Sequence, residues 1–344
     1  MTTPGRPEPG GEPVHVRAQS VTATLAPDGT LDVRGSLLDL RTRGFLPVGG
    51  SMQGMGIIHH MELAWTVDAA AGTVVGWRPV QPTVAFEATA ETGGESCRDP
   101  LGRLTALGAT PLGRPLSAAL REQIGGPLGC SHLVTLGLFM DAALRAGLAR
   151  RPPGAAHAAP RPLWRRDVVF DAHEETAGRV AVAVRLADLD WNDAPADALA
   201  PERFARLHEL AARVDADLWP GTLAAITGAE RLRTAARFTA EPWTDRATLL
   251  APLAGIGLAR GAAAAIATGL GDGPEAAPWR DALAMLPPAL VQCRAAHPDA
   301  WHEKVRATPR HPGLTALPDS CFMWRRDGAL ERIRQQQGAG KGGR

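Results

Sequence analysis

The sequence IIHHMELAWTVD, residues 57–68, alternates between apolar and polar side chains, which is typical of a half-buried strand. Because neighbouring side chains of a strand point to opposite faces, the odd-numbered residues form its apolar face. These residues are Ile57, His59, Met61, Leu63, Trp65 and Val67. The alternation therefore predicts that His59 points into the protein and that His60 points away from it.

The neighbouring sequence extends this strand into an antiparallel meander followed by helices. Residues 14–40 are typical of two strands around the turn Pro27-Asp28-Gly29-Thr30, and Ala70-Ala71-Gly72 leads into a fourth strand at 73–80. Helical spacing of apolar residues follows, with Pro or Ser near each start, at 100–107, 115–124 and 131–148. We therefore expect an α+β fold that opens with a four-stranded sheet packed by helices.

The second half is predicted to contain another hairpin and then mostly helices. The hairpin is expected at 167–172 and 179–188, and its sequence at 182–189 echoes residues 33–40, as a degenerate duplication would. Ala- and Leu-rich stretches predict helices at 201–216, 218–240, 244–270 and 279–296. Pro287-Pro288 must kink or split the last of these helices.

The domain organisation follows from changes in composition. Residues 150–163 are rich in Pro and Ala and are typical of a linker. We expect a disordered tail at 1–13, a sheet with helices and the candidate site at 14–149, the linker at 150–163, a hairpin plus helical domain at 164–330 and a second disordered tail at 331–344.

The composition of the chain bears on its partners and on its location in the cell. The chain has 344 residues, and 37 Lys and Arg against 36 Asp and Glu leave a formal charge of +1. This balance gives no electrostatic reason to expect nucleic acid or a membrane surface as a partner. The sequence has no apolar run long enough to span a membrane and no secretory signal, so we expect a soluble, cytoplasmic protein. A small-molecule substrate is compatible with this composition, and the sequence does not determine the oligomeric state.

The sequence GGPLGCSHL, residues 125–133, places Cys130 and His132 where a glycine turn meets an apolar helix. A helix N-terminus points unpaired N–H groups at such a thiol, which lowers the cysteine pKa and favours the thiolate. A capped helix with a small buried cysteine explains the same residues. The two side chains lie about 200° apart around a helix axis, which argues against both reaching one ion.

The order of these features resembles the uncharacterised bacterial domain-of-unknown-function family 2889. The resemblance covers residues 14–148 and rests on five motifs: Asp28-Gly29, Leu37-Leu38-Asp39, the His59–Leu63 strand ending at Asp68, the lone Cys97, and 125–133. The segment from Cys321 to Gly328 is similar to the Cys-x-x-x-x-x-Asp-Gly with which shorter members of the family close.

This family is similar, more distantly, to the U-type iron–sulfur cluster scaffolds, in which an acidic strand residue and later cysteines share one metal. The resemblance implies that His59 replaces the acidic ligand and that Cys97 and Cys130 match the two later cysteines. It departs from the scaffolds at Ile57, where their first cysteine would fall. The implied site is a Zn or Fe ion at His59, Cys97 and Cys130, with His132 or Cys321 as the fourth ligand.

Three functions are compatible with these residues. The first is a metal-dependent enzyme of small-molecule or secondary metabolism, and the second is a non-catalytic metal or sulfur carrier. The third is a metal-free thiol enzyme with Cys130 as the nucleophile and His132 or His59 as the base. Cys130 and His132 are the predicted catalytic residues. The sequence contains no Gly-x-Ser-x-Gly, phosphate loop or dinucleotide fingerprint.

Overall fold

The computed structural model divides the chain into two compact units. We call residues 21–161 with 316–344 the first unit, and residues 1–20 with 162–315 the second unit. The predicted tails lie largely outside the described residues, as do residues 153–158 of the predicted linker. The structure describes residues 11–43, 55–105, 107–152, 159–192, 203–219, 221–234, 241–258, 261–297 and 319–332.

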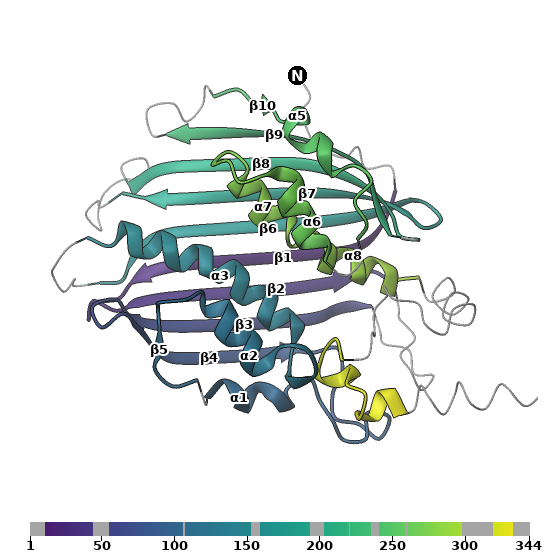
Figure 1. Ribbon diagram of the computed structural model, residues 1–344, viewed down its shortest axis with the longest axis horizontal. Helices are drawn as coiled ribbons and strands as arrows, with labels where there is room; N and C mark the ends of the chain where they lie inside the picture. The colour runs from purple at the N-terminus through teal and green to yellow at the C-terminus, as the bar shows by residue number, and fades with distance from the viewer. Residues whose placement is uncertain are drawn as a thin grey trace, which may run out of the picture. The chain divides into compact units, whose positions relative to one another are not determined.

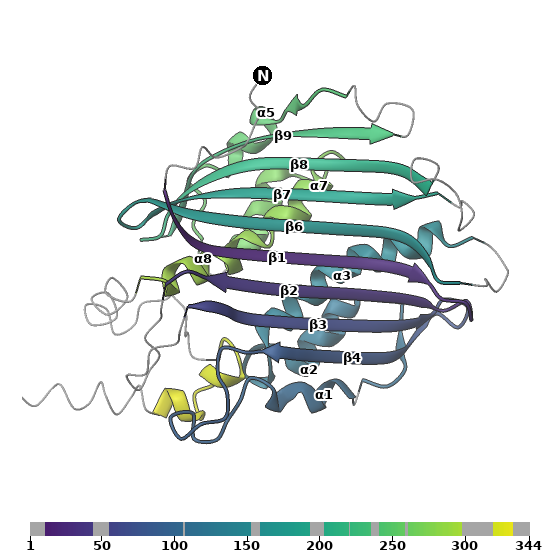
Figure 2. The ribbon, with the colours of Figure 1, turned by 180° about the vertical axis from the view of Figure 1, so that it is seen from behind.

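The first unit is an antiparallel sheet with helices on one face (Figures 1 and 2). Residues 21–25 of β1 (Glu12–Leu25) flank β2, and from β2 onward the strands pair in chain order: β2 (Leu31–Arg41), β3 (Gly56–Asp68), β4 (Thr73–Thr83) and β5 (Thr110–Pro111). The helical elements are η1 (Asp99–Leu101), α1 (Gly102–Thr105), α2 (Leu116–Ile124), η2 (Gly126–Leu128), α3 (Ser131–Arg150) and η5 (Phe322–Trp324). The predicted meander and the three predicted helices are confirmed.

Strand β3 has the predicted alternation over most of its length. His59 is 4% exposed, whereas the side chain of His60 is 34% exposed, so His59 points inward as predicted. The prediction for Ile57 is wrong, because this residue is 48% exposed. The register of β2 on β3 shifts between Asp39 and Leu40, and such a bulge inserts one residue and exchanges the faces beyond it.

Helix α3 packs on β2 and β3 and provides the core of the first unit. It approaches β2 closely at Gly35, where a Cβ atom would lie 2.7 Å from Met140. Asp141 of α3 accepts hydrogen bonds from the backbone N–H groups of Leu116 (3.0 Å) and Ser117 (3.2 Å), which caps α2 and fixes it against α3. Among the described helices, α3 alone is long and apolar enough to cross a membrane. Half of its apolar stretch is buried inside the protein, however, as in a core helix.

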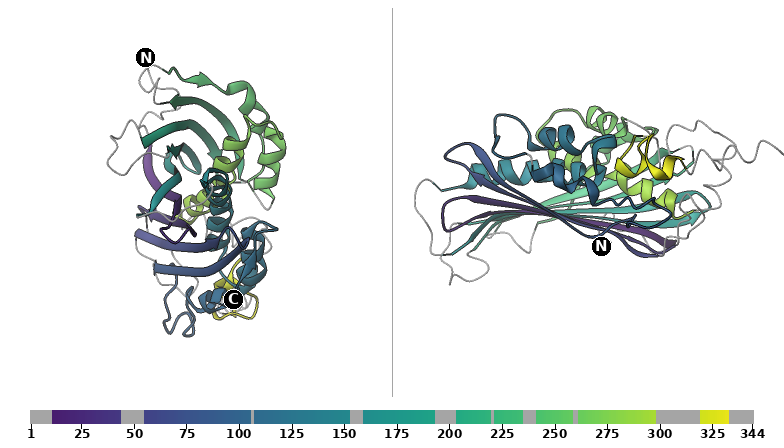
Figure 3. Two further views of the ribbon diagram at one scale, coloured as in Figure 1. Left: turned by 90° about the vertical axis from the view of Figure 1, so that its left-hand side faces the viewer. Right: turned by 90° about the horizontal axis from the view of Figure 1, so that it is seen from below.

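The second unit also combines antiparallel strands with helices that lie on one face of them (Figure 3). Residues 12–20 of β1 flank β6, and the strands then pair in chain order: β6 (Arg161–Thr176), β7 (Arg179–Trp191), β8 (Phe204–Asp217), β9 (Thr222–Thr234) and β10 (Thr244–Asp245). The helical elements are α5 (Ala247–Leu250), η4 (Ala251–Leu253), α6 (Ala262–Leu270), α7 (Ala277–Leu283) and α8 (Leu286–Ala295). The predicted hairpin and the α+β class are confirmed.

The helices predicted at 201–216 and 218–240 are wrong, because these stretches contain the strands β8 and β9. Their alanines suit a helix, but Leu210, Ala212, Val214 and Ala216 of β8 are buried at every second position, which is the period of a strand. Strand β8 pairs with β7 and β9 along its length, and this pairing overrides the intrinsic preference. The split at Pro287-Pro288 is confirmed, since α8 starts there anew.

A buried carboxylate, Glu230 of β9, ties the second unit's helices to its sheet. Trp279 Nε1 of α7 donates a hydrogen bond to Glu230 Oε2 at 2.8 Å, and Arg246 forms an ion pair with the same carboxylate. Burial alone would raise the pKa of Glu230, but the hydrogen bonds from His208, Arg246 and Trp279 lower it to about 2. The folded state therefore strongly favours the ionised form.

This lowered pKa predicts an acid-sensitive step in stability. A depressed folded pKa contributes stability that is present above the unfolded value and is lost as pH falls through the folded value. We expect wild type to lose about 2 kcal/mol more unfolding free energy than Glu230→Gln between about pH 5 and pH 2. Urea unfolding at both pH values measures this difference, and parallel pH dependences of the two proteins would contradict it.

Candidate metal centre

Asp39 and His59 form a buried pair across two neighbouring strands. They lie directly opposite each other in the register of β2 on β3, on the face that packs against α3. Asp39 is fully buried, and its Oδ2 lies 2.9 Å from His59 Nδ1. The pairing of the sheet therefore places an imidazole and a carboxylate within hydrogen-bonding distance in the interior.

His132 joins this pair from the first turn of α3. Its Nε2 lies 3.8 Å from Asp39 Oδ2, and its ring centroid lies 4.0 Å from that of His59. Each of the three residues offers one ligand atom, and these atoms all lie within 4.8 Å of one another. No other trio of His, Cys, Asp or Glu in the described part of the chain comes this close. The His132 side chain is 20% exposed and forms the solvent-facing side of the trio.

Arg41 adds a positive charge close to this trio. It lies two residues beyond Asp39 on the same face of β2 and is almost fully buried. Burial lowers the pKa of Arg41 to about 10, although the charge of Asp39 opposes that shift. Arg41 therefore stays protonated at neutral pH and favours the ionised form of Asp39.

Cys130 is the N-cap residue of α3, but its surroundings differ from those of His132. Its Sγ lies 3.9 Å from Met61 Sδ, which also accepts a hydrogen bond from Gln81 Nε2 at 3.5 Å. Burial raises the pKa of Cys130 to about 11, although the backbone N–H groups of Leu133 and His132 favour the thiolate. The expected lowering of this pKa by the helix N-terminus is therefore wrong, because burial outweighs it.

Cys130 and Cys321 both lie close enough to Cys97 to act on it electrostatically, and none of the described cysteines is in a disulfide. Burial raises the pKa of Cys97, and the neighbouring Cys130 and Cys321 raise it further. Cys321 precedes η5, and burial raises its pKa as well. Cys293 belongs to α8 of the second unit and donates to the Ala289 carbonyl at 3.5 Å, in the apolar core as expected.

The structure divides the predicted site residues into two groups. His59 lies with Asp39 and His132, whereas Cys97 and Cys130 lie with Cys321. Cys130 and His132 thus contact different neighbours, as expected from their angular separation on the helix. The ligand set of His59, Cys97 and Cys130 stays a prediction that nothing in this arrangement tests.

Asp39 is the candidate residue that sequence reasoning missed, although a signal for it was present. It has the same parity as Leu31, Val33 and Leu37, which form the buried face of β2. An aspartate on the apolar face of a strand requires a partner, because a buried charge without one is strongly unfavourable. The alternation of β2 therefore indicates that Asp39 lies on the buried face of the sheet, as His59 does.

Comparison with known proteins gives one match. No curated protein and no solved structure matches this chain. The comparisons therefore lend no support to the more distant similarity to iron–sulfur scaffolds. Residues 15–145, which include Asp39, His59 and His132 but cover less than half of the chain, match the family described as protein of unknown function, DUF2889.

Proposed function

We propose that the first unit is a metal-dependent enzyme of small-molecule chemistry, with a Zn²⁺ or Fe²⁺ ion held by Asp39, His59 and His132. The observation that carries this proposal is the approach of three ligand atoms to within 4.8 Å of one another. Two imidazoles and one carboxylate are the ligands of many catalytic zinc sites and of non-haem iron(II) sites. The proposal keeps the predicted metal and His59, and it assigns Asp39 and His132 in place of the two cysteines.

The distances between the ligand atoms suit such an ion. An ion about 2.1 Å from each ligand atom places these atoms about 3.0 to 3.5 Å apart in octahedral or tetrahedral geometry. The Asp39–His59 separation of 2.9 Å and the Asp39–His132 separation of 3.8 Å lie on either side of this range. A small movement of the His132 ring would therefore complete the site. Ion binding would also displace any proton that His59 Nδ1 shares with Asp39.

Three protein ligands support a catalytic role rather than a structural one. Structural zinc sites are closed by four protein ligands, whereas catalytic sites keep a position for water or substrate. A bound ion would supply Lewis acidity or a water of lowered pKa at that position. His132 forms the solvent-facing side, so a small substrate would enter along α3's first turn. Arg41 would keep Asp39 ionised and ready to bind the cation.

The metal content of matched histidine variants tests the proposal. We expect the purified full-length chain to hold about one more Zn or Fe ion after reconstitution than His59→Gln does. His60→Gln is the matched control, because His60 is the next residue of β3 and points to the opposite face. Elemental analysis by mass spectrometry measures all three proteins, with circular dichroism to confirm folding.

Two outcomes would count against the proposal. One is equal metal content in wild type and His59→Gln, and the other is a wild-type chain that binds no ion at this site. Release of the ion to a mild chelator without unfolding would instead favour the non-catalytic carrier, whose site must be labile. Turnover of a substrate that depends on the ion would favour the enzyme.

The hydrogen-bond distance between Asp39 and His59 favours a second candidate function. In a metal-free site Asp39 would accept a hydrogen bond from His59 Nδ1–H, which orients the ring and leaves Nε2 as a general base. An ion-free wild type with a low-field proton resonance that disappears in Asp39→Asn would support this candidate. The predicted thiol enzyme has less support, because Cys130 is a neutral thiol at neutral pH.

A further inference from the structure

Three segments distant in the sequence bring their cysteines to one place in the first unit. Cys130 precedes α3 and Cys321 precedes η5. The N–H of Phe322 donates to the Gly129 carbonyl at 2.7 Å, which joins the two segments. The N–H of Cys97 donates to the Phe86 carbonyl at 3.1 Å. The Phe86 ring in turn meets the Trp324 ring edge to face at 5.8 Å.

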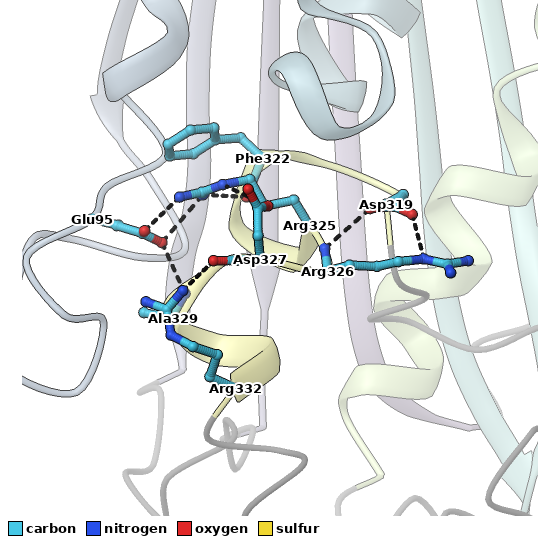
Figure 4. A network of polar contacts seen from close by, with 8 residues as sticks. All are labelled: Glu95, Asp319, Phe322, Arg325, Arg326, Asp327, Ala329 and Arg332. Carbon is cyan, nitrogen blue, oxygen red and sulfur yellow. Dashed lines mark hydrogen bonds and ion pairs between the residues drawn. The ribbon is translucent and has the colours of Figure 1, made fainter.

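A polar network fixes the segment that carries Cys321 (Figure 4). Arg325 forms an ion pair with Glu95, two residues before Cys97, and its guanidinium stacks 3.9 Å from the centre of the Phe322 ring. The N–H of Ala329 donates to the same Glu95 carboxylate at 3.2 Å. The loop of Cys97 and the segment 319–332 are therefore attached to each other next to the thiols.

The backbone around two of the thiols is arranged in the same way. Cys130 receives the N–H groups of the residues two and three positions later, His132 and Leu133. Cys321 receives those of Met323 and Trp324, again two and three positions later. Donors directed at sulfur stabilise a thiolate, and ligands bound to metal ions are commonly hydrogen-bonded in this manner. The local backbone therefore directs N–H donors at two sulfur atoms whose segments are joined by the hydrogen bond between Phe322 and Gly129.

We propose that Cys97, Cys130 and Cys321 bind a thiophilic divalent ion of the Zn²⁺ type and thereby clamp the segment 319–332 to the first unit. This site is separate from the Asp39–His59–His132 trio and does not depend on the function proposed for it. On binding, each thiol releases its proton to solvent and the three thiolates coordinate the cation. A water molecule completes the tetrahedron.

The cluster needs a small closure to take up the ion. Zinc–sulfur bonds of about 2.3 Å place the sulfur atoms about 3.8 Å apart. The three Sγ atoms do not all lie within 4.8 Å of one another, so at least one thiol must move inward. A change of one cysteine rotamer moves its Sγ by about 3 Å, so we expect metal binding to select another rotamer of at least one of the three thiols.

Cadmium-113 NMR of the reduced, metal-depleted full-length chain is the first test. The chemical shift of ¹¹³Cd reports how many thiolates bind the ion, so wild type alone is informative. We expect one strongly deshielded, thiolate-bound signal, which persists in His59→Gln. A second, more shielded signal would belong to the histidine and carboxylate site. Absence of a thiolate-bound signal in wild type would overturn the proposal, whatever the variants do.

Cobalt titration of cysteine variants is the second test. Thiolate-bound Co²⁺ gives an intense charge-transfer absorption in the near-ultraviolet, which we expect in wild type and in the matched control Cys293→Ser. We expect Cys97→Ser, Cys130→Ser and Cys321→Ser to bind at least about 100-fold more weakly and to lose this absorption. An unchanged spectrum in folded Cys321→Ser would contradict the three-thiol site.

Discussion

Asp39→Asn is expected to abolish metal binding at the trio and to lower the free energy of unfolding by about 3 kcal/mol. Asparagine has nearly the same shape but no charge, so Arg41 and any protonated His59 would lose their buried anion. Asp39 and Arg41 are both almost fully buried, and removing one member of a buried charge pair is much worse than removing both. Urea unfolding and elemental analysis measure the two effects.

The same strand offers a matched control for this substitution. Asp32 also precedes an arginine by two residues in β2, but its partner Arg34 has an exposed side chain. We expect Asp32→Asn to change the unfolding free energy by less than about 1 kcal/mol and to leave the metal content unchanged. Similar losses in the two variants would show that burial at Asp39 does not have the expected consequence.

Arg166→Met is expected to cause the largest loss of stability in the second unit, about 3 to 5 kcal/mol. Arg166 of β6 binds Asp188 of β7 with two hydrogen bonds, at 2.5 and 2.7 Å, and Asp281 of α7 at 2.6 Å. Burial alone would lower the pKa of Arg166, but the two carboxylates raise it above its ordinary value. Methionine replaces the apolar stem and leaves Asp188 as a buried anion without its cation.

The neighbouring Arg165 provides the control, because it also binds an aspartate, Asp167, with two hydrogen bonds. The Arg165 side chain is 44% exposed, whereas that of Arg166 is 6% exposed. An exposed pair contributes little, so we expect Arg165→Met to change the unfolding free energy by less than about 1 kcal/mol. Thermal and urea unfolding of both variants compare them. Equal effects would contradict the role assigned to burial.

The sequence predicted the first unit better than the second, for a physical reason. The alternation in 57–68 is strong and ends in clear turns, so β3 and its neighbouring strands could be located. The stretches of β8 and β9 contain many alanines, which are small enough for either a buried strand or a helix. Only their pairing in the sheet distinguishes the two possibilities, and pairing is a non-local property.

The candidate sites show the same division between local and non-local information. Residue types and the strand period identified His59 as an inward imidazole and marked Cys130 and His132 as conspicuous. They could not show that Asp39 lies opposite His59, because this depends on the register of two strands and on a bulge beside them. The position of Cys321 near Cys130 depends on a segment that returns after almost two hundred residues.

By itself, the sequence determined which faces of the first strands are buried, where the helices of the first unit begin and which residue types could hold a metal. These properties depend on side chains a few residues apart, whose geometry is set by the period of a strand or a helix. Only the tertiary structure decided that His59 and His132 meet Asp39, and that Cys97 and Cys130 meet Cys321. The reason is that the register of the strands and the return of a distant segment bring the ligand side chains together. No local sequence pattern encodes either of these.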